Sequence, residues 1–558
     1  MCHGGPSSAI GSILGVFLLA AGFPAAAEPV DMALVGNISS TPEGRMEGVL
    51  VNARKQRSSV TVTVVSDAQG HYAFPANKLD SGQYSLSIRA VGYELSAPAT
   101  AEVVSEQTTT RDLQLHPAQD LAAQLTNGEW IASVPGTDAQ KGALLNCTGC
   151  HTLECIVRSD HTADDFMAVL ERMHGYVNQS IPAHPQFRHA DRLMEEQGDQ
   201  RVAVQQSLAE YLATINLSAT PKWNYTLKAL PRPSGRATRV IVTEYDLPRE
   251  TIEPHDVVVD GDGIVWYSSF GEPNLGRLDP RSGRVTEFPL PELKPGFPTG
   301  SLGLRTDAAG NLWLGMMYQG GIARFDKQTE TFRIWPLPVA DNIDAAQVNM
   351  VSPQSSEVDG KVWTQNNGFA GVHRLYIATG SIETFQPFRQ APKGEPHNIY
   401  DVIPDSRNNA DFTDFRQRHI GRIDAKSGQV TVFATPTPRS APRRGMMDAQ
   451  DRLWFGEYRG NRIGMFDTKT AEFTEWLTPT PWTAPYDVTL DKNGDAWTGS
   501  MSTDRVLRLD TQTGQFVEYL LPRETNIRRV FVDDKTSPVT FWVGSNHGAS
   551  IVKVEPLD

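Results

Sequence analysis

Short runs of alternating apolar and polar residues make up most of this chain. Near the N-terminus they occur at residues 48–51, 59–65, 71–74 and 83–88, with turn residues between them. A period of two that is rich in β-branched and aromatic residues is typical of strands with one buried face. We therefore expect residues 28–118 to form a small β-sandwich.

Between residues 119 and 222 the spacing of apolar residues changes from two to three and four. The clearest run holds Phe166, Val169, Leu170 and Met173, which one face of a helix would bring together. We expect a helical domain here, with further apolar positions at Leu121, Leu125, Leu144, Leu145, Val204, Leu208, Tyr211 and Leu212.

Residues 223–558 contain an internal repeat, in which an aromatic residue recurs 47, 50, 49, 42, 43 and 45 residues apart. In each repeat a strand that ends in acidic and turn residues precedes the aromatic strand, and two short strands follow. Four short strands per period of about 45 residues predict a β-propeller blade. The aromatic positions are Trp266, Trp313, Trp363, Phe412, Trp454, Trp497 and Trp542.

The seventh repeat holds only three strands, and residues 240–248 match the missing fourth strand. Pairing strands from both ends of the repeat region would close the ring without an open sheet edge. The predicted fold is therefore multidomain and mainly β. It consists of a β-sandwich, an α-helical domain and a seven-bladed β-propeller.

The first 27 residues have the features of a secretory signal peptide. Small and apolar residues fill positions 9–27, and Ala25, Ala26 and Ala27 form an A-x-A cleavage site before Glu28. No Lys or Arg precedes the apolar run, which departs from the usual pattern. We predict a cleaved signal peptide, a periplasmic protein and no stable membrane insertion.

The overall charge narrows the range of partners. The formal net charge is -14 at pH 7, and no run of basic residues occurs. An acidic protein is repelled by phosphate backbones and by anionic lipid surfaces. We therefore expect neither a nucleic acid nor a membrane surface as partner.

The motif C-x-x-C-H at residues 147–151 carries the most specific chemistry in the chain. It is the attachment signature of c-type haem, in which Cys147 and Cys150 hold the vinyl groups and His151 binds the iron. We expect one covalent haem c per chain. The alternatives are a zinc half-site or a redox dithiol, but no second cysteine pair follows. Cys155 is predicted to be a small buried side chain beside the haem.

A helical segment of about a hundred residues around C-x-x-C-H resembles a cytochrome c domain, which we assign to residues 119–222. The segment has Ile181 where many cytochromes place the distal methionine, and isoleucine cannot bind iron. We choose Met173 as distal ligand because it lies on the predicted apolar helix face. His174 is the second choice. The other candidates are His161, His184, His189 and Met194.

Two further resemblances concern the flanking domains. Residues 66–74, 82–84 and 90–93 resemble carboxypeptidase regulatory-like modules, whose members are usually adhesive or spacer modules. The blades resemble the virginiamycin B lyase (streptogramin lyase) family in residues 420–424, 454–458 and 462–467 and in the recurring V-T-E-F-P-L-P strand. This second resemblance implies a propeller fold and a lyase that opens a cyclic depsipeptide ester with metal-supported His and Glu side chains.

The lyase resemblance points to particular residues. His255 and His397 match the family's Pro-His pairs, and Glu457 matches the Glu after its Trp strand. The alignment of the repeats also places Asp256 and Arg444 near the entrance of the central channel, where a His–Asp pair could act as a base. We therefore select His255, Asp256, His397, Arg444 and Glu457 as catalytic candidates. The alternative is that the channel charges pair across blades and plug the channel.

Together these features favour a periplasmic c-type haem protein in electron transfer. In this hypothesis the propeller binds or oxidises an unidentified small molecule, and a periplasmic redox partner exchanges electrons with the haem. One alternative is a streptogramin-type C–O lyase with an accessory haem domain. Another is a non-catalytic electron-transfer scaffold.

Overall fold

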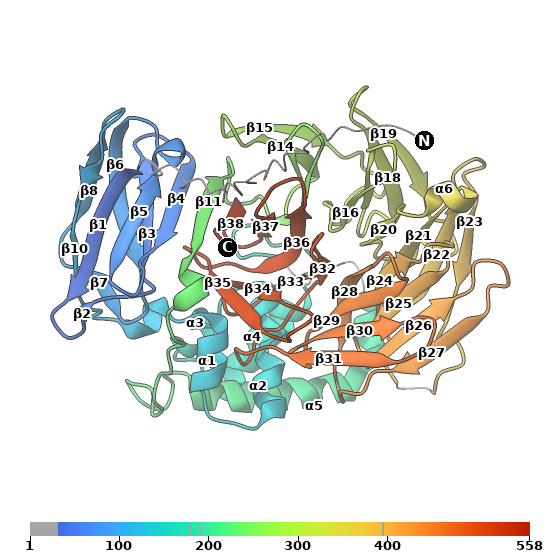
Figure 1. The fold of residues 1–558 in the computed structure, drawn as a ribbon. Coiled ribbons are helices and arrows are strands. Elements are labelled where there is room, and N and C mark those ends of the chain that lie inside the picture. Colours follow the sequence, from blue (N-terminus) through green and yellow to red (C-terminus); the bar gives the residue numbers. More distant parts are fainter. Residues whose placement is uncertain (1–31, 178–179, 189–190, 393–394) are drawn as a thin grey trace, which may run out of the picture.

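The computed structural model describes residues 32–177, 180–188, 191–392 and 395–558. Figure 1 shows an N-terminal β domain, a group of helices and a ring of small sheets, so the molecule is multidomain and mainly β. The helices lie along one face of the ring. The predicted signal peptide lies outside the described residues.

The N-terminal domain consists of two packed sheets. Leu34 and Phe74 from one sheet and Val51 and Leu86 from the other share a core, as expected for strands with one apolar face. The first sheet holds β1 (Met32–Ser40), β2 (Gly44–Arg45), β5 (His71–Pro75), β7 (Tyr93–Leu95), β9 (Thr109–Thr110) and β10 (Leu113–Pro117). The second holds β3 (Leu50–Lys55), β4 (Val60–Val65), β6 (Gly82–Arg89) and β8 (Ala99–Val103).

The repeat region folds into seven four-stranded antiparallel units within the described part of the chain. Their inner strands contact one another in a closed ring, which makes the units propeller-like blades. Each of the seven predicted aromatic residues lies on the second strand of its unit. The blades are β12 (Pro254–Val259), β13 (Val265–Ser269), β14 (Asn274–Asp279), β15 (Arg284–Pro289); β16 (Leu304–Thr306), β17 (Leu312–Gly315), β18 (Gly321–Asp326), β19 (Thr331–Pro336); β20 (Val351–Ser352), β21 (Lys361–Asn366), β22 (Gly371–Tyr376), β23 (Ile382–Phe385); β24 (Ile399–Pro404), β25 (Ala410–Asp414), β26 (His419–Ile423), β27 (Val430–Ala434); β28 (Pro442–Met447), β29 (Arg452–Glu457), β30 (Arg462–Asp467), β31 (Phe473–Leu477); β32 (Thr489–Leu490), β33 (Ala496–Gly499), β34 (Arg505–Leu509), β35 (Phe516–Leu520); and β36 (Ile527–Asp533), β37 (Thr540–Ser545), β38 (Ser550–Pro556), β11 (Val240–Asp246).

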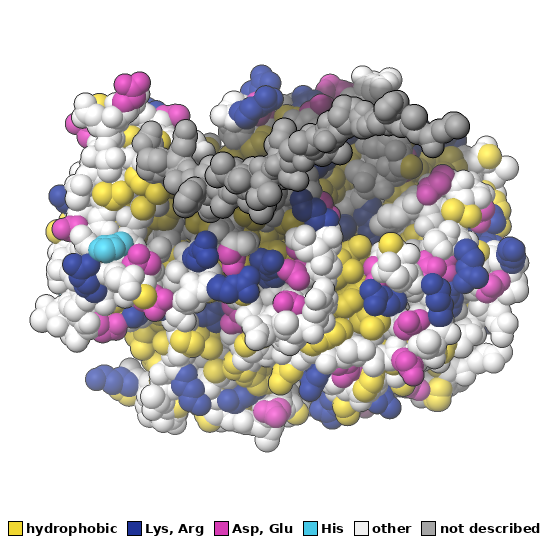
Figure 2. All heavy atoms as spheres, in the orientation of Figure 1, with side chains coloured by type: hydrophobic (Ala, Val, Ile, Leu, Met, Phe, Trp, Pro, Cys, Tyr) yellow, Lys and Arg dark blue, Asp and Glu magenta, His cyan; other side chains and the backbone are white. Residues whose placement is uncertain are grey.

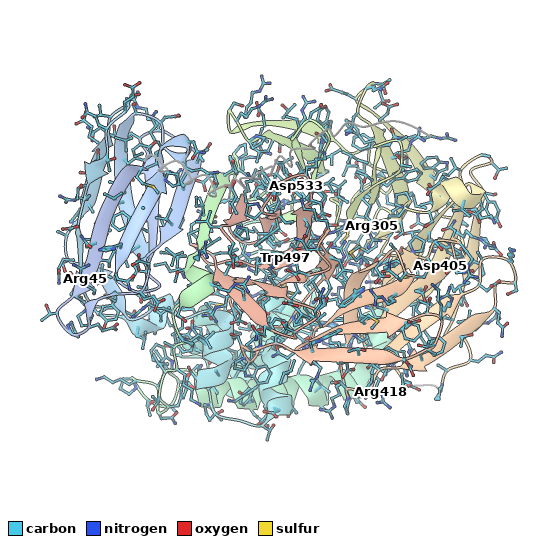
Figure 3. All side chains as sticks on the ribbon, viewed as in Figure 1. Arg45, Arg305, Asp405, Arg418, Trp497 and Asp533 are labelled. Carbon is cyan, nitrogen blue, oxygen red and sulfur yellow. The ribbon has the colours of Figure 1, made fainter. Side chains whose placement is uncertain are left out.

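A hydrogen bond between a tryptophan and an aspartate explains why both residues recur. The indole Nε1 of Trp497, labelled in Figure 3, donates to Asp491 Oδ2 at 2.9 Å. The aspartate follows the last residue of the first strand and stands six residues before the tryptophan, so the bond fixes the hairpin and satisfies a buried donor. Equivalent pairs are Trp266–Asp260, Trp313–Asp307 and Trp454–Asp448.

The seventh blade closes the ring as the sequence predicts. Strand β11 pairs antiparallel with β38, from Val240 opposite Pro556 to Asp246 opposite Ser550. The other edge of β11 pairs with β4 of the N-terminal domain. One eight-stranded sheet therefore runs from the channel through the seventh blade into the sandwich, and it fixes the orientation of the two domains.

The helical segment packs on the ring rather than standing alone. Trp130 and Phe166 from the helices share one hydrophobic core with Met350, Tyr458 and Met501 from the propeller. Its elements are α1 (Asn127–Ser133), α2 (Asp138–Leu144), the short 3-10 helix η3 (Cys147–Gly149), α3 (Glu154–Val157), α4 (Ala163–His174) and α5 (Asp191–Ile215).

The buried face predicted for the last helix, α5, is confirmed only in part. Leu212 is buried, as expected, but the Val204 side chain is 64% exposed. Val204 therefore belongs to the solvent side of α5, because the helix packs through one narrow face.

The outer surface carries charges of both signs. On the face shown in Figure 2, Lys and Arg side chains are interspersed with Asp and Glu. Among the described helices, none is both long and apolar enough to cross a bilayer.

Candidate functional site

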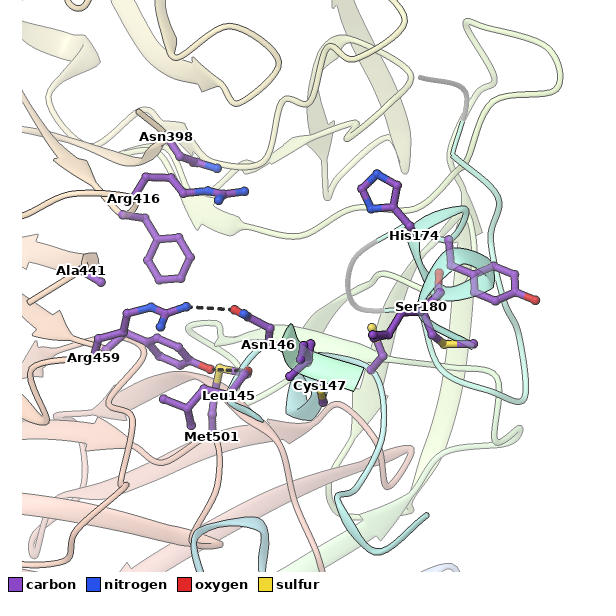
Figure 4. Close-up of a pocket in the computed structure, with 18 of the residues that line it drawn as sticks. Leu145, Asn146, Cys147, His174, Ser180, Asn398, Arg416, Ala441, Arg459 and Met501 are labelled. Carbon is purple, nitrogen blue, oxygen red and sulfur yellow. Dashed lines mark hydrogen bonds between the residues drawn. The ribbon is translucent and has the colours of Figure 1, made fainter. Parts of the chain in front are cut away.

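A cavity of about 1480 Å³ lies between the helical segment and the central funnel of the propeller. Cys147, Cys150 and His151 line it together with Met173 from α4 and Tyr400 from the fourth blade. Figure 4 shows Cys147 between the propeller residue Arg459 on one side and His174 on the other. The C-x-x-C-H motif and the funnel therefore share one space.

Three propeller side chains hold the C-x-x-C-H loop against the funnel. Asn526 Nδ2 donates to the carbonyl of Thr148 at 2.7 Å, and Arg528 Nη2 donates to the carbonyl of Gly149 at 2.9 Å. His547 Nε2 lies 3.3 Å from the same Gly149 carbonyl. The loop is thus fixed by the blade that also carries the closing strand.

The fifth and sixth blades hold the preceding helices. Tyr458 Oη donates to the carbonyl of Leu145 at 3.1 Å, and Arg459 Nη2 donates to Asn146 Oδ1 at 3.0 Å. At Gly128 a Cβ atom would lie 2.6 Å from Thr503 Cγ2, so this close approach of α1 to the propeller requires glycine.

The ring of His151 is oriented by its own loop. Its Nδ1 lies 2.9 Å from the carbonyl of Thr152, and because a carbonyl can only accept, Nδ1 is the donor of this hydrogen bond. Nε2 makes no hydrogen bond to the part of the chain that the structure describes. A histidine that donates through Nδ1 presents Nε2 as a metal ligand.

The nearby cysteines Cys147, Cys150 and Cys155 form no disulfide. Burial raises the pKa of Cys147 to about 12, so this thiol is protonated at neutral pH. Cys155 is exposed, which corrects the prediction of a buried side chain. The cause is its position on the open side of the short helix α3, where Sγ lies 3.1 Å from His151 Nδ1.

Met173 lies near the end of helix α4 and also lines the cavity. The helix begins with a capping box, in which Thr162 and Asp165 bond each other's backbone N–H groups. Met173, His174 and His161 all line the cavity, and so does the buried Ile181. Of the other candidate ligands, His184 does not line it, the side chain of Met194 is not described, and His189 lies outside the described residues.

The cavity is strongly cationic although the protein is acidic. Eight arginines line it, and Glu395 is the single carboxylate among its described lining residues. Arg418, labelled in Figure 3, is one of six on the helical side and rim, with Arg172, Arg188, Arg416, Arg439 and Arg459. Such a lining concentrates anions.

Arg443 and Arg528 form the floor of the cavity and are buried. The guanidinium of Arg443 lies 3.9 Å from the ring centre of Tyr486 and 4.7 Å from that of Tyr400. The same guanidinium lies 4.5 Å from the ring centre of Phe415 and 4.6 Å from that of Tyr458. Four aromatic rings thus surround this cation, and cation–π attraction holds it in place.

A chain of hydrogen bonds leads from the cavity floor into the channel. Burial lowers the pKa of His255 to about 3, so the ring is neutral, and its Nδ1 donates to Asp256 Oδ1 at 2.8 Å. Its Nε2 then accepts from Tyr486 Oη at 3.1 Å. Tyr486 Oη bonds Tyr400 Oη, which accepts from Arg443 Nη2 at 3.2 Å.

The hydrogen-bond chain contains two tyrosines, Tyr400 and Tyr486. Of these two, Tyr400 lines the cavity and Tyr486 does not. Burial opposes the ionisation of Tyr400, but the Arg443 guanidinium and the hydrogen bond with Tyr486 outweigh burial. The pKa of Tyr400 therefore lies below its ordinary value. A phenol of this kind exchanges a proton more readily than an ordinary tyrosine.

His255, Asp256 and Arg444 lie together, but none of them lines the cavity. All three are fully buried. Arg444 donates two hydrogen bonds to Asp256, at 2.6 and 2.8 Å, and Arg529 adds a third at 3.1 Å. This is the arrangement expected if channel charges pair across blades, and Arg305, near the middle of the propeller in Figure 3, pairs with Asp401 in the same way.

His397 lies beside the cavity, next to the lining residues Pro396 and Asn398. Its Nδ1 is 2.7 Å from Asp414 Oδ2, and its ring stacks on Phe388 at 3.9 Å. One donor atom each from His397, Asp414 and His419 lie within 4.8 Å of one another, and these types of side chain bind metal ions.

Glu457 is buried at the end of β29 and does not line the cavity. Neither carboxylate oxygen has a hydrogen-bond partner among the described residues. Burial and the neighbouring Glu475 raise the pKa of Glu457 to about 9, so it is protonated at neutral pH. Within the described part of the chain, no hydrogen bond or ion pair joins Glu457 to His255 or His397.

The catalytic candidates selected from the sequence include Arg444 but leave out Arg443, Arg528 and Tyr400, which line the cavity. A signal was present as two adjacent arginine pairs, 443–444 and 528–529, at the start of inner strands. Successive residues of a strand point to opposite sides. One arginine of each pair therefore faces the cavity, and the other faces the carboxylates of the channel.

The comparisons with known proteins agree with the ring of blades. The Virginiamycin B lyase family matches residues 234–447 and 407–557, which together exceed half of the chain. The chain belongs to this family. The carboxypeptidase regulatory-like domain matches residues 33–116, in agreement with the predicted N-terminal module. Neither match reaches residues 119–222, so the comparisons give no support to a cytochrome c domain there.

Two solved structures are similar to part of this chain. Virginiamycin B lyase from Staphylococcus aureus is 25% identical, with 56% of this chain and 99% of that chain covered and a TM-score of 0.48. A streptogramin B lyase structure is 24% identical, with 58% and 99% covered and a TM-score of 0.49. No curated protein matches this chain.

Proposed function

We propose that this member of the virginiamycin B lyase family is a c-type haem protein that exchanges electrons with a small molecule bound in the propeller funnel. The observation that carries the proposal is the shared cavity. Cys147, Cys150 and His151 line the same space as Tyr400 and Arg443. A ligand in the funnel would therefore lie next to the group held by the motif.

The residues present fit a covalent haem. Cys147 and Cys150 lie three residues apart at the cavity wall, and neither is in a disulfide. His151 keeps Nε2 available because Nδ1 faces the Thr152 carbonyl. Met173 lines the same cavity, and its thioether could help to hold the iron of such a group. Apolar side chains from the helices, including Phe166, Leu170 and Leu212, supply the surroundings that such a ring needs.

The roles of the chain's own residues follow from these positions. Haem supplies one-electron transfer when it is bound. Asn526 and Arg528 hold the loop carbonyls and so keep His151 fixed relative to the funnel. Tyr400, at the end of the hydrogen-bond chain, is placed to accept or give a proton when a ligand in the funnel changes its charge.

Two measurements on the full-length protein test this function. Protein expressed with haem-maturation machinery is expected to retain the mass of one haem under denaturing conditions, and Cys147→Ala/Cys150→Ala is expected to lose it. Ascorbate, an anionic reductant, should reduce the oxidised protein more slowly after Arg443→Gln, whereas a neutral hydroquinone should be unaffected. A colourless product, or equal slowing of both reductants, contradicts the proposal.

A C–O lyase is the second candidate, and family membership favours it more directly than the redox function. In the structure, His397 has an unpartnered buried Nε2 among the described residues and lies near Asp414 and His419. The test is chromatography of a streptogramin B ester incubated with haem-free protein. Opening of the ring, lost after His397→Ala, would establish the lyase, whereas an intact ester would exclude it for that substrate.

The location and partners belong to the same proposal. We infer a periplasmic protein, because covalent haem is attached outside the bacterial cytoplasm and residues 1–27 have the pattern of a signal peptide. A soluble periplasmic redox protein would accept the electrons. Fractionation of cells that express the full chain checks the location, and recovery in the cytoplasm contradicts it.

A further inference from the structure

The inner strands of the propeller carry five arginines around the channel, and these fall into two groups. Arg305, Arg444 and Arg529 each form an ion pair with an aspartate at 2.6 to 3.1 Å. Arg443 and Arg528 have no carboxylate partner within the described part of the chain, although both are buried. These two are the ones that line the cavity.

A buried cation without an anion is energetically costly, because burial removes its hydration. The Nε atoms of Arg443 and Arg528 are buried and lack a hydrogen-bond partner among the described residues. The carboxyl group of Glu253 interacts electrostatically with Arg528, but burial raises the pKa of Glu253 to about 8. Glu253 is therefore neutral at pH 7 and does not balance the charge.

We propose that Arg443 and Arg528 bind the carboxylate of a ligand that enters this cavity. Guanidinium groups recognise carboxylates through paired, charge-assisted hydrogen bonds. Tyr400 Oη lies beside Arg443 and supplies a further polar contact. The inference deepens the proposed function, since it names the chemical class of the molecule in the shared cavity.

The walls next to the two arginines define the rest of the ligand. Phe415, Ala441, Tyr458 and Met501 line the cavity around Arg443. Such a wall favours a flat apolar body attached to the carboxylate. Two sources offer this chemistry, namely a free aromatic carboxylate and the propionate of a bound tetrapyrrole.

Fluorine NMR on the full-length protein tests the site, with para-fluorobenzoate as probe and neutral para-fluorobenzamide as its isosteric control. Binding of the benzoate should broaden its resonance, and the benzamide should bind at least about tenfold more weakly. Arg443→Gln and Arg528→Gln should each weaken benzoate binding about tenfold. Arg416→Gln removes an exposed rim arginine of the same cavity and should change it less than twofold.

The measurement is made on haem-loaded protein and on Cys147→Ala/Cys150→Ala, and unchanged near-ultraviolet circular dichroism checks that each variant is folded. Benzoate binding to both forms assigns the site to a free ligand, and binding to the haem-free form alone assigns it to a propionate. Either result supports the carboxylate site. Absence of binding in both forms overturns it, and so does an equal loss for Arg416→Gln. Because the haem-free form is tested separately, failure of haem attachment leaves this test intact.

Discussion

The carboxyl group of Glu457 gives the sharpest test of how burial controls ionisation in the propeller. It is fully buried, has no hydrogen-bond partner in the described part of the chain, and has a pKa raised from 4.5 to about 9. A folded pKa above the unfolded value means that stability is lost as the pH rises from about 4.5 to about 9. At pH 7 the loss is about 3 kcal/mol, from about 2.5 pH units at 1.36 kcal/mol each.

Glu457→Gln keeps the shape of the protonated side chain and removes its titration. The variant should therefore unfold at higher urea concentration than the parent protein at pH 7, with a gain in unfolding free energy of about 3 kcal/mol that vanishes near pH 4. Urea titrations from pH 4 to pH 9 measure this difference. A loss of stability at every pH would refute the reasoning, since it would mean that the ionised carboxylate is bonded.

Glu272→Gln is the matched control. Hydrogen bonds from Arg249 are the main cause that holds the pKa of Glu272 below its usual range. Its contribution to stability is present above the unfolded pKa and is lost as the pH falls through the folded pKa. The same substitution should therefore destabilise the protein at pH 7, with the opposite pH dependence.

Three further predictions concern the channel and the cavity. Arg444→Met leaves the buried carboxylate of Asp256 without two short hydrogen bonds and should lower the unfolding free energy by about 3 kcal/mol. Arg443→Met leaves no carboxylate without a partner and should lower the unfolding free energy by less in the same urea titration. Equal losses would contradict this assignment. Ultraviolet titration should show one tyrosine ionising below the ordinary range, and Arg443→Gln should raise its pKa; an unchanged titration would show that Arg443 does not act on Tyr400. Met173→Ala in haem-loaded protein should abolish a sulfur-to-iron charge-transfer band and lower the midpoint potential, while His174→Ala should leave both unchanged; the reverse result assigns the ligand to His174.

Much of the fold could be predicted because it follows from local patterns. The recurring tryptophans and their aspartates identify the blades, since each pair closes one hairpin. The strand at residues 240–246 was predictable from its resemblance to the outer strands of other blades. Its second partner, β4, was not, because pairing between separate domains leaves no periodic signal in either segment.

The site was harder to predict than the fold. The C-x-x-C-H motif is visible in the sequence because its residues are consecutive, and the structure places its two cysteines and its histidine at the cavity. The catalytic candidates His255 and Arg444 were chosen as residues at the channel entrance, but their partners lie on other blades. Only the folded ring shows that Arg444 is neutralised by Asp256 while its neighbour Arg443 is not.

If one cavity holds both a haem and the funnel ligand, diffraction at the iron absorption edge should locate the iron inside it. Crystals of protein matured with haem should give one anomalous peak next to His151 Nε2, inside the cavity bounded by Met173 and Arg528. Absence of a peak, or a peak outside this cavity, would contradict the account.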